Sequence, residues 1–415
     1  DRAAGAADRY FPGAKPMTAQ ISPSKTPTRF TNFALFCLMA SALLLVAYFE
    51  SATSALTILN FCLIAAIMSL GVNMQWGFAG LLIVGVMGFV ACVGLAVVLV
   101  TARPVPEAVS AGAGGIVVAA LVVAITVAAL LYLRARLSGT LGTLALIVVG
   151  TIGYFLARSF FDPSVEAIEA VEPAVSGFLG GLGLTAYLGN LGGNIVAWIV
   201  GGLFAAAIAF VIGKITLGLR SDYLAIATLG ISEIIIFGLK NEDWLSRGVK
   251  NVNGLPRPVT SAVELQQSAQ VQQWAADWGM TVIELSSILV KLGFAAIYIV
   301  VLMLLLWLSE TALRSPWGRM MRAIRDNETA AEAMGKDVKR QHLQIFILGS
   351  AVLGIAGAML VSTDAQFTPG SYQPLRYTFL IWVMVIVGGS GNNWGAVLGG
   401  FVIGFFWIQA EPLGL

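Results

Sequence analysis

LQIFILGSAVLGIAGAMLVST, residues 343–363, runs without a single Asp, Glu, Lys or Arg. About 20 helical residues cross the hydrocarbon core of a bilayer, so an uncharged apolar stretch of this length predicts a membrane-spanning helix. Uncharged stretches of similar length recur at residues 31–49, 51–72, 81–102, 111–133 and 137–157. Two longer ones, residues 174–213 and 377–410, have room for two spans or for a span and a re-entrant piece. The sequence therefore predicts an all-α polytopic membrane protein.

The composition of the 415 residues agrees with this fold class. Hydrophobic residues make up 58% of the chain and charged residues only 11%, whereas soluble domains carry about 25% charged residues. The formal net charge of +2 gives no indication of a nucleic-acid partner. All three cysteines lie inside apolar stretches, where we interpret them as small buried side chains rather than as disulfides or metal ligands.

The basic residues predict which loops face the cytoplasm, because cytoplasmic loops are enriched in Lys and Arg. We expect 10–11 spans, and eleven fit the charges: residues 31–49, 55–72, 81–101, 113–133, 140–157, 195–213, 222–240, 283–308, 343–362, 375–389 and 394–410. With the N-terminus inside, the basic linkers 134–139, 214–221 and 309–342 are all cytoplasmic. The acidic linker around Glu166 and the segment 240–282 then fall outside, as periplasmic segments.

The two ends of the chain are interpreted separately. Residues 1–30, rich in Ala, Pro and Ser with five basic residues, read as a cytoplasmic tail ahead of a transmembrane domain of residues 31–415. The sequence begins with Asp1, so either Met17 is the start or residues are missing upstream.

One polar segment interrupts this apolar chain. Residues 309–342 contain seven basic and five acidic residues. Ser315 and Pro316 predict a helix start, and Gly335 predicts a stop. Within these bounds four apolar side chains fall on one face and two acids lie beside them: Met320, Ile324, Ala331 and Met334, with Glu328 and Glu332. Such a stripe lies on the bilayer surface or docks in a groove of another protein, and the mixed charge favours the protein partner.

Two glycine-interrupted segments lie near opposite ends of the apolar part of the chain. GVNMQWGFAG spans residues 71–80 and GGSGNNWG spans residues 388–395. Irregular backbone at membrane depth is tolerated where it is buried in protein or lines a cavity, and paired interrupted helices often mark a transporter's binding site. The candidate substrate-path residues in these segments are Asn73, Gln75, Trp76, Asn392 and Asn393. The alternative is ordinary packing between helices through small residues.

Glu233 is the acid deepest within a predicted span. An ionisable residue within the membrane is a functional candidate by default. The alternative is a structural partner for a hydroxyl, amide or base such as Thr228 or a residue of another helix.

The sequence carries no pattern for chemistry of its own. It lacks the G-x-x-x-x-G-K-[ST] nucleotide-binding motif, since Gly213-Lys214 is followed by Ile215, and it lacks the G-x-S-x-G turn of a hydrolase. We expect no catalytic residues, no metal and no cofactor. If ATP drives this protein, another chain binds the ATP.

Several segments together resemble a known family. ETAAEAMGKDVKRQHLQIF (328–346) resembles the cytoplasmic coupling loop of ABC-importer permeases, whose loose pattern is an acid, two alanines and a glycine. LRSDYLAIATLGISEII (219–235), GVNMQWGFAGLL (71–82) and VGGSGNNWGAVLGG (387–400) are similar in order and character to the branched-chain amino acid ABC permeases. The resemblance covers roughly residues 55–410.

The resemblance implies an ABC-importer permease fold, in which residues 309–342 form the coupling loop. The residues expected to contact an ATPase are Met320, Ile324, Glu328, Ala331, Glu332, Met334 and Gly335. It implies a bacterial inner-membrane subunit that carries branched-chain or related hydrophobic amino acids. The implied partners are a second permease, two cytoplasmic ATP-binding subunits and a periplasmic substrate-binding protein. A urea or short-amide permease of the same family and a stand-alone ion-coupled carrier are the alternatives.

The chain also departs from the family pattern. Residues 83–86 read IVGV where the family often has Asn, Phe, Gly and His, and the segment 255–282 is longer than usual. The family usually continues past the position of Leu415 into a further apolar segment and a basic tail. We therefore expect the printed sequence to be part of a longer chain.

Overall fold

The computed structural model describes residues 29–137, 139–172 and 176–410. Eight helices in these ranges are long and apolar enough to cross a membrane. They are α3 (Ala52–Val72) continued by η1 (Asn73–Gly77), α5 (Pro106–Arg136), α6 (Thr140–Glu169), α7 (Leu184–Thr216), α8 (Ser221–Asn241), α12 (Val282–Arg314), α15 (Val338–Asp364) and α17 (Asn393–Ala410). Three shorter apolar helices are α2 (Arg29–Phe49), α4 (Val86–Thr101) and α16 (Pro374–Gly388). Each of the eleven predicted spans thus corresponds to one helix, and the all-α polytopic fold is confirmed. The predicted tail, residues 1–30, lies almost entirely outside the described residues.

Short elements connect these helices. They are α9 (Asp243–Ser246), η2 (Gly248–Lys250), β1 (Val252–Asn253), α10 (Ala262–Gln267), α11 (Ala269–Trp278), α13 (Pro316–Asp326), α14 (Glu328–Ala333), β2 (Gln366–Phe367) and η3 (Pro369–Ser371). The two strands pair antiparallel, with Val252 opposite Phe367 and Asn253 opposite Gln366. This pairing ties the loop after η2 to the end of α15.

Several helix boundaries differ from the sequence prediction. Helix α6 continues to Glu169, so most of the predicted acidic linker is helical even though Pro163 lies within it. Helix α4 begins only at Val86, after an irregular stretch that follows η1. Helix α7 begins at Leu184, eleven residues before the predicted span, and bends at Gly189, which has a positive φ of 72°.

The core of the bundle lies where α3, α4, α7 and α15 pack together. Helix α4 is buried on nearly all sides, which is why its sequence is hydrophobic all round. Small residues allow close helix packing there: a Cβ on Gly354 of α15 would lie 3.1 Å from the carbonyl oxygen of Gly201 of α7. In membranes such small-residue contacts are a main source of helix association.

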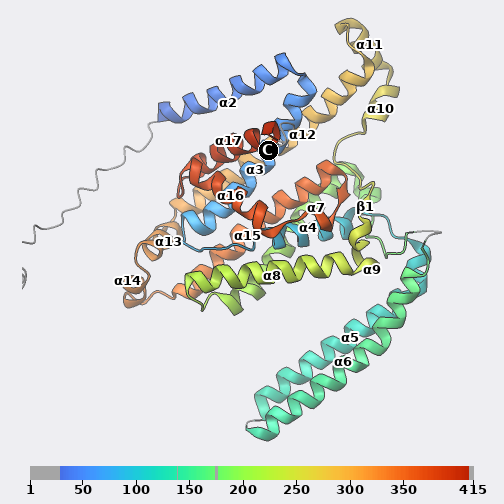
Figure 1. Ribbon diagram of the computed structural model, residues 1–415, viewed down its shortest axis with the longest axis vertical. Coiled ribbons are helices and arrows are strands. Elements are labelled where there is room, and N and C mark those ends of the chain that lie inside the picture. Colours follow the sequence, from blue (N-terminus) through green and yellow to red (C-terminus); the bar gives the residue numbers. More distant parts are fainter. Residues whose placement is uncertain (1–28, 138, 173–175, 411–415) are drawn as a thin grey trace, which may run out of the picture.

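Helices α5 and α6 form a hairpin that projects from the bundle (Figure 1). They pack mainly against each other, and only 6% of α5's apolar window and 17% of α6's is buried, compared with 78% for α3. At the base of the hairpin the ring of Phe161 packs edge-on against Trp244, with ring centres 5.5 Å apart. The outward side chains of the hairpin are apolar, as expected for a surface covered by lipid or by another chain.

The bundle has two distinct ends (Figure 1). One, the α13 end, carries α13, α14, η1 and the turn between α16 and α17. The other, the α10 end, carries α10, α11, the β1–β2 pair and η3. Helix α12 runs from the α10 end to the α13 end, and α15 runs back.

Candidate functional site

The two glycine-interrupted segments lie side by side at the α13 end. The amide nitrogen of Asn73 donates to the amide oxygen of Asn393 over 3.0 Å, and the backbone N–H of Gly391 donates to the side-chain oxygen of Asn73 over 2.9 Å. Both asparagines are buried. The contact requires glycine at position 77, because a Cβ there would lie 2.1 Å from the Asn73 oxygen and 2.5 Å from the Gly391 nitrogen. The two segments are therefore joined by direct hydrogen bonds.

The remaining side chains of these segments also contact other helices. The amide nitrogen of Gln75 donates to the carbonyl oxygen of Phe346 and to the hydroxyl of Ser350 in α15. The Trp76 ring packs against Trp382 of α16, with ring centres 4.7 Å apart. These are contacts of the packing alternative, and a role of Asn73, Gln75 and Trp76 in a substrate path stays a prediction.

Asn392 begins the next helix. Its side-chain oxygen accepts a hydrogen bond from the backbone N–H of Trp394 over 3.1 Å, in the manner of a helix cap. The side-chain nitrogen of its neighbour Asn393 donates to Glu310 of α12 over 3.2 Å. A substrate role for Asn392 and Asn393 likewise stays a prediction.

The polar segment folds as two short helices, α13 and α14, separated by Asn327. The side-chain oxygen of Asn327 accepts from the backbone N–H of Ala330 over 2.9 Å and caps α14. Ile324 is only 1% exposed and lies in the core, whereas Met334 is 80% exposed. Met320 and Ala331 are partly buried against the same core.

The four apolar side chains thus do not form one exposed face, because the turn at Asn327 changes the helix direction. Of the predicted coupling residues, those on and just after α14 are exposed: Glu328, Glu332, Met334 and Gly335. Ile324 is buried within the chain itself, so the prediction that it contacts a partner is not supported by its position.

Arg325 of α13 connects the polar segment to the interrupted segments. Its guanidinium donates to the carbonyl oxygen of Gly77 over 2.6 Å and also forms an ion pair with Asp326 at 2.9 Å. On the other side, Glu310 accepts from Asn393 and forms an ion pair with Arg314. A continuous set of hydrogen bonds therefore joins α12, α13, η1 and the start of α17. The sequence analysis did not single out Arg325 or Glu310, because long-range partners leave no local pattern.

Glu233 lies on an exposed face of α8. The face comprises Ile226, Gly230, Glu233 and Phe237, all exposed and spaced by four, three and four residues. Thr228, the partner considered from the sequence, instead bonds the carbonyl of Ala225 and accepts from the backbone of Val84. Within the described part of the chain Glu233 has no hydrogen-bond or ion-pair partner.

A cavity opens at the α10 end, in a region where the sequence indicated no candidate site residues. A pocket of about 350 Å³ lies between α3, α4, α15, η3, α16 and α17. It shares Asp364, Gln366, Phe61, Ile64 and Leu360 with a second pocket of about 480 Å³. The two are therefore adjoining parts of one open cavity.

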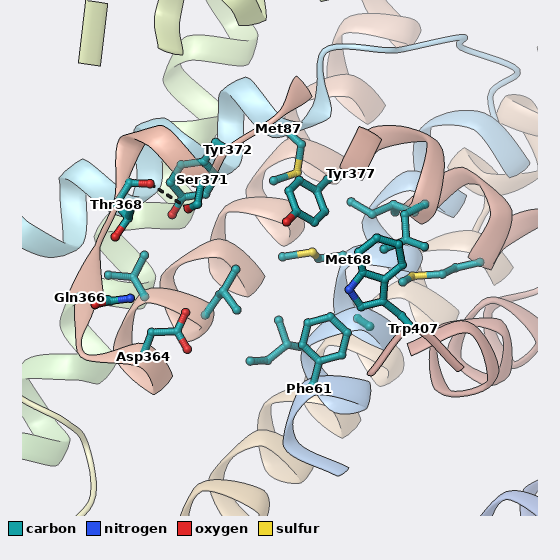
Figure 2. A pocket seen from close by; sticks show the side chains of 17 residues that line it. Phe61, Met68, Met87, Asp364, Gln366, Thr368, Ser371, Tyr372, Tyr377 and Trp407 are labelled. Atoms are coloured by element: carbon teal, nitrogen blue, oxygen red, sulfur yellow. Dashed lines mark hydrogen bonds between the residues drawn. The ribbon is translucent and has the colours of Figure 1, made fainter. Parts of the chain in front are cut away.

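Polar and apolar groups occupy different sides of this cavity. Figure 2 shows Asp364, Gln366 and Thr368 on one side and Met68, Phe61 and Trp407 on the other. Tyr372 lies beside the polar group; burial, together with the nearby Asp364 carboxylate, raises the pKa of its phenol. The phenol therefore stays protonated at neutral pH and can act as a hydrogen-bond donor.

Two bases and a buried amide line the second pocket. Lys291 of α12 donates to the carbonyl oxygen of Thr53 and to the hydroxyl of Thr57, so much of its hydrogen-bonding capacity is used. Arg257, which follows β1, is exposed in the pocket. The side-chain oxygen of Asn60 is buried and has no partner within the described residues. These basic and amide side chains, together with Asp364, suit an organic ion. No group of three His, Cys, Asp or Glu side chains that could hold a metal occurs in the described ranges.

Comparison with known proteins places this bundle among permeases. The family described as "Branched-chain amino acid transport system / permease component" matches residues 173–410, more than half of the chain. The high-affinity branched-chain amino acid transport system permease protein LivM of Escherichia coli K12 is 30% identical over 207 residues, 49% of this chain and 48% of that protein. No solved structure matches the chain.

Other relatives extend the comparison. The probable branched-chain amino acid transport permease protein LivM of Methanocaldococcus jannaschii is 26% identical over 63% of this chain and 65% of its own length. The D-allose transport system permease protein AlsC of Escherichia coli K12 is 27% identical over 63% of this chain and 67% of its own. The chain spans about half to two thirds of the length of the LivM relatives it matches. It belongs to the family of permease components of branched-chain amino acid transport systems.

Proposed function

We propose that this chain is the membrane-embedded subunit of an ATP-driven ABC importer that carries branched-chain or related hydrophobic amino acids across the bacterial inner membrane. Its partners are a second permease, two cytoplasmic ATP-binding subunits and a periplasmic substrate-binding protein. Family membership and the names of the LivM relatives support this proposal. The sequence given carries no G-x-x-x-x-G-K-[ST] motif, so in this proposal a partner subunit binds the ATP.

The observation that carries the proposal is the hydrogen-bonded route from the polar segment into the bundle. Helix α14 presents Glu328, Glu332 and Met334 outward at the α13 end. Movement of α14 reaches α13, and Arg325 transmits it to the carbonyl of Gly77. From there it reaches the Asn73–Asn393 contact between the interrupted segments. ATPase motion at the surface thus has a physical path to the spans.

The proposed assembly also predicts how the chain is oriented in the membrane. The α13 end faces the cytoplasm, where the ATPases and the basic linkers lie. The α10 end then faces the periplasm, and its cavity receives cargo from the binding protein. The N-terminus is cytoplasmic in this arrangement.

The exposed face of α8 is the candidate surface for the second permease in this proposal. Carboxylates within a membrane are costly and almost always face protein or water rather than lipid. Glu233 stands on that face between Ile226 and Phe237. We therefore expect the second permease, with a base, amide or hydroxyl opposite Glu233, to cover it.

The test is ATP-dependent leucine uptake by the complete transporter carrying Met334→Asp. Met334 is 80% exposed, so the change leaves the fold of this chain intact but places a carboxylate in the apolar part of the ATPase contact. An unpaired charge buried in a contact costs several kcal/mol, so we expect uptake to fall at least tenfold and the ATP-binding subunits to be lost on purification.

Val249→Asp is the matched control, because Val249 is an equally apolar, exposed residue at the α10 end. It should retain both uptake and ATP-binding subunits. Normal uptake by Met334→Asp with the subunits in place would contradict the proposed coupling. Leucine uptake that depends on an ion gradient instead of ATP would favour the stand-alone carrier, and uptake of urea or D-allose in place of leucine would change the cargo.

A further inference from the structure

The cavity at the α10 end brings together one acid and one base that no other contact uses. Within the described residues Asp364 and Arg257 form no ion pair with each other or with any other residue. Both line the same pocket of about 480 Å³. Both side chains are exposed to the cavity, so a ligand that carries both opposite charges can reach them and form a charge-assisted hydrogen bond with each.

The smaller pocket suits the apolar part of such a ligand. Its volume of about 350 Å³ lies within the ~300–1,000 Å³ typical of ligand sites. Asp364 stands where the two pockets join, and the wall opposite it holds Met68, Phe61 and Trp407 (Figure 2). Methionine and aromatic side chains provide an adaptable apolar surface for aliphatic groups of differing shape.

From this arrangement we infer that the cavity binds a zwitterionic α-amino acid with an apolar side chain. Asp364 binds the ammonium group where the pockets join, Arg257 binds the carboxylate in the larger pocket, and the side chain enters the smaller pocket. The phenol of Tyr372 and the free oxygen of Asn60 supply a donor and an acceptor nearby. This inference rests on the proposed function for its biological meaning, but the site is defined by its own chemistry.

Other ligands fit the cavity less well. A neutral sugar has no charge to balance Asp364 or Arg257. A lipid acyl chain fits the apolar wall but leaves both charged groups without partners. Lys291 is a weaker candidate for the carboxylate than Arg257, because it already donates to Thr53 and Thr57.

Binding of radiolabelled L-leucine to the full-length chain in lipid nanodiscs tests the inference. Unlabelled leucine should compete fully. 4-Methylpentanoate lacks the ammonium group and 3-methylbutylamine lacks the carboxylate, so each should compete at least tenfold more weakly. D-allose should not compete.

Two charge-neutralising variants assign the two ends of the ligand. Asp364→Asn should weaken leucine binding at least tenfold and remove the preference for leucine over 4-methylpentanoate. Arg257→Gln should weaken it similarly and remove the preference over 3-methylbutylamine. Glu284→Gln is the control, because Glu284 is exposed in the first turn of α12, outside the lining of both pockets. A variant with a damaged fold would bind all of these compounds more weakly, whereas loss of a ligand contact changes the preference among them.

Absence of saturable leucine binding to the unaltered chain would overturn the inference, as would wild-type selectivity in both variants or equal competition by D-allose. ATP-dependent uptake keeps this result separate from the proposed function. If Asp364→Asn and Arg257→Gln take up leucine normally, the proposed function holds and the leucine site is contradicted. If the chain binds leucine selectively but shows no ATP-dependent uptake, the leucine site holds and the proposed function is contradicted.

Discussion

The two ends of the bundle treat polar groups in opposite ways. At the α13 end, polar side chains are hydrogen-bonded between elements: buried Asn73 to buried Asn393, and exposed Arg325 to the carbonyl oxygen of Gly77. At the α10 end, Asp364 and Arg257 are exposed and unpaired around an open cavity. The hydrogen bonds give the α13 end the character of a structural joint, whereas the exposed charges leave the α10 end open to a ligand.

The sequence alone points to the α13 end for a substrate site, and that role stays a prediction. The amides near glycine-interrupted helix drew attention as substrate contacts, yet in the structure their hydrogen bonds hold helices together. Asp364 ends an ordinary span and Arg257 lies in a loop, so neither stands out along the chain. Which polar groups are free to bind a ligand depends on which side chains pair with each other in the folded structure.

The largest expected effect comes from disrupting the contact between the two interrupted segments at the α13 end. Gly77→Ala places a Cβ 2.1 Å from the Asn73 oxygen and 2.5 Å from the Gly391 nitrogen, so the two interrupted segments must move apart. We expect the Tm of the detergent-purified chain to fall by roughly 5 °C or more. Gly218→Ala, where a Cβ meets nothing within 4 Å, should leave the Tm unchanged. An unchanged Tm in Gly77→Ala would contradict the described contact.

A smaller effect is expected at Glu233, which lies on the exposed face of α8. If the second permease covers the exposed face of α8, Glu233→Leu leaves the partner's polar group without its hydrogen bond, which costs about 1–3 kcal/mol. Co-purification of the second permease should then fall, and Glu233→Gln, which keeps a hydrogen-bonding group, should fall less. If lipid covers the face, Glu233→Leu should instead raise the Tm and leave assembly intact.

The smallest effect concerns an exposed ion-pair cluster beyond α6. Hydrogen bonds from Lys250 and Arg247 lower the pKa of Glu172. A carboxyl whose folded-state pKa is below its unfolded value stabilises the fold above the unfolded value, and this stabilisation is lost as pH falls through the folded pKa. Thermal unfolding scans should therefore show Glu172→Gln slightly less stable than the unaltered chain at pH 7 and equal to it in strong acid. A difference that grows toward low pH would have the wrong sign.

Much of the fold was predictable because membrane spans leave a direct trace in the sequence. Apolar stretches with few or no charges located all eleven apolar helices, since a bilayer leaves a long apolar segment little alternative to helix. The extension of α6 through Pro163 was missed, because Pro and four nearby acids locally favour a helix end.

The sites were less predictable than the helices. Residues 71–80 and 388–395 were each predicted as candidate substrate segments, but the contact between them was not predicted. Arg257 and Asp364 are far apart in the sequence, and the pairing of β1 with β2 brings their segments together. No periodic pattern or motif in the sequence indicates that two such distant residues line the same cavity.

The most direct test of the account is thiol labelling of intact cells with a membrane-impermeant reagent, in a Cys37→Ser background that removes the exposed native cysteine. Gln366→Cys places a thiol in the cavity of the α10 end and Met334→Cys places one on the surface of the α13 end. The account predicts that Gln366→Cys reacts from outside and is protected by leucine, whereas Met334→Cys reacts only after the membrane is permeabilised. Labelling of Met334→Cys in intact cells, or of Gln366→Cys only after permeabilisation, would contradict it.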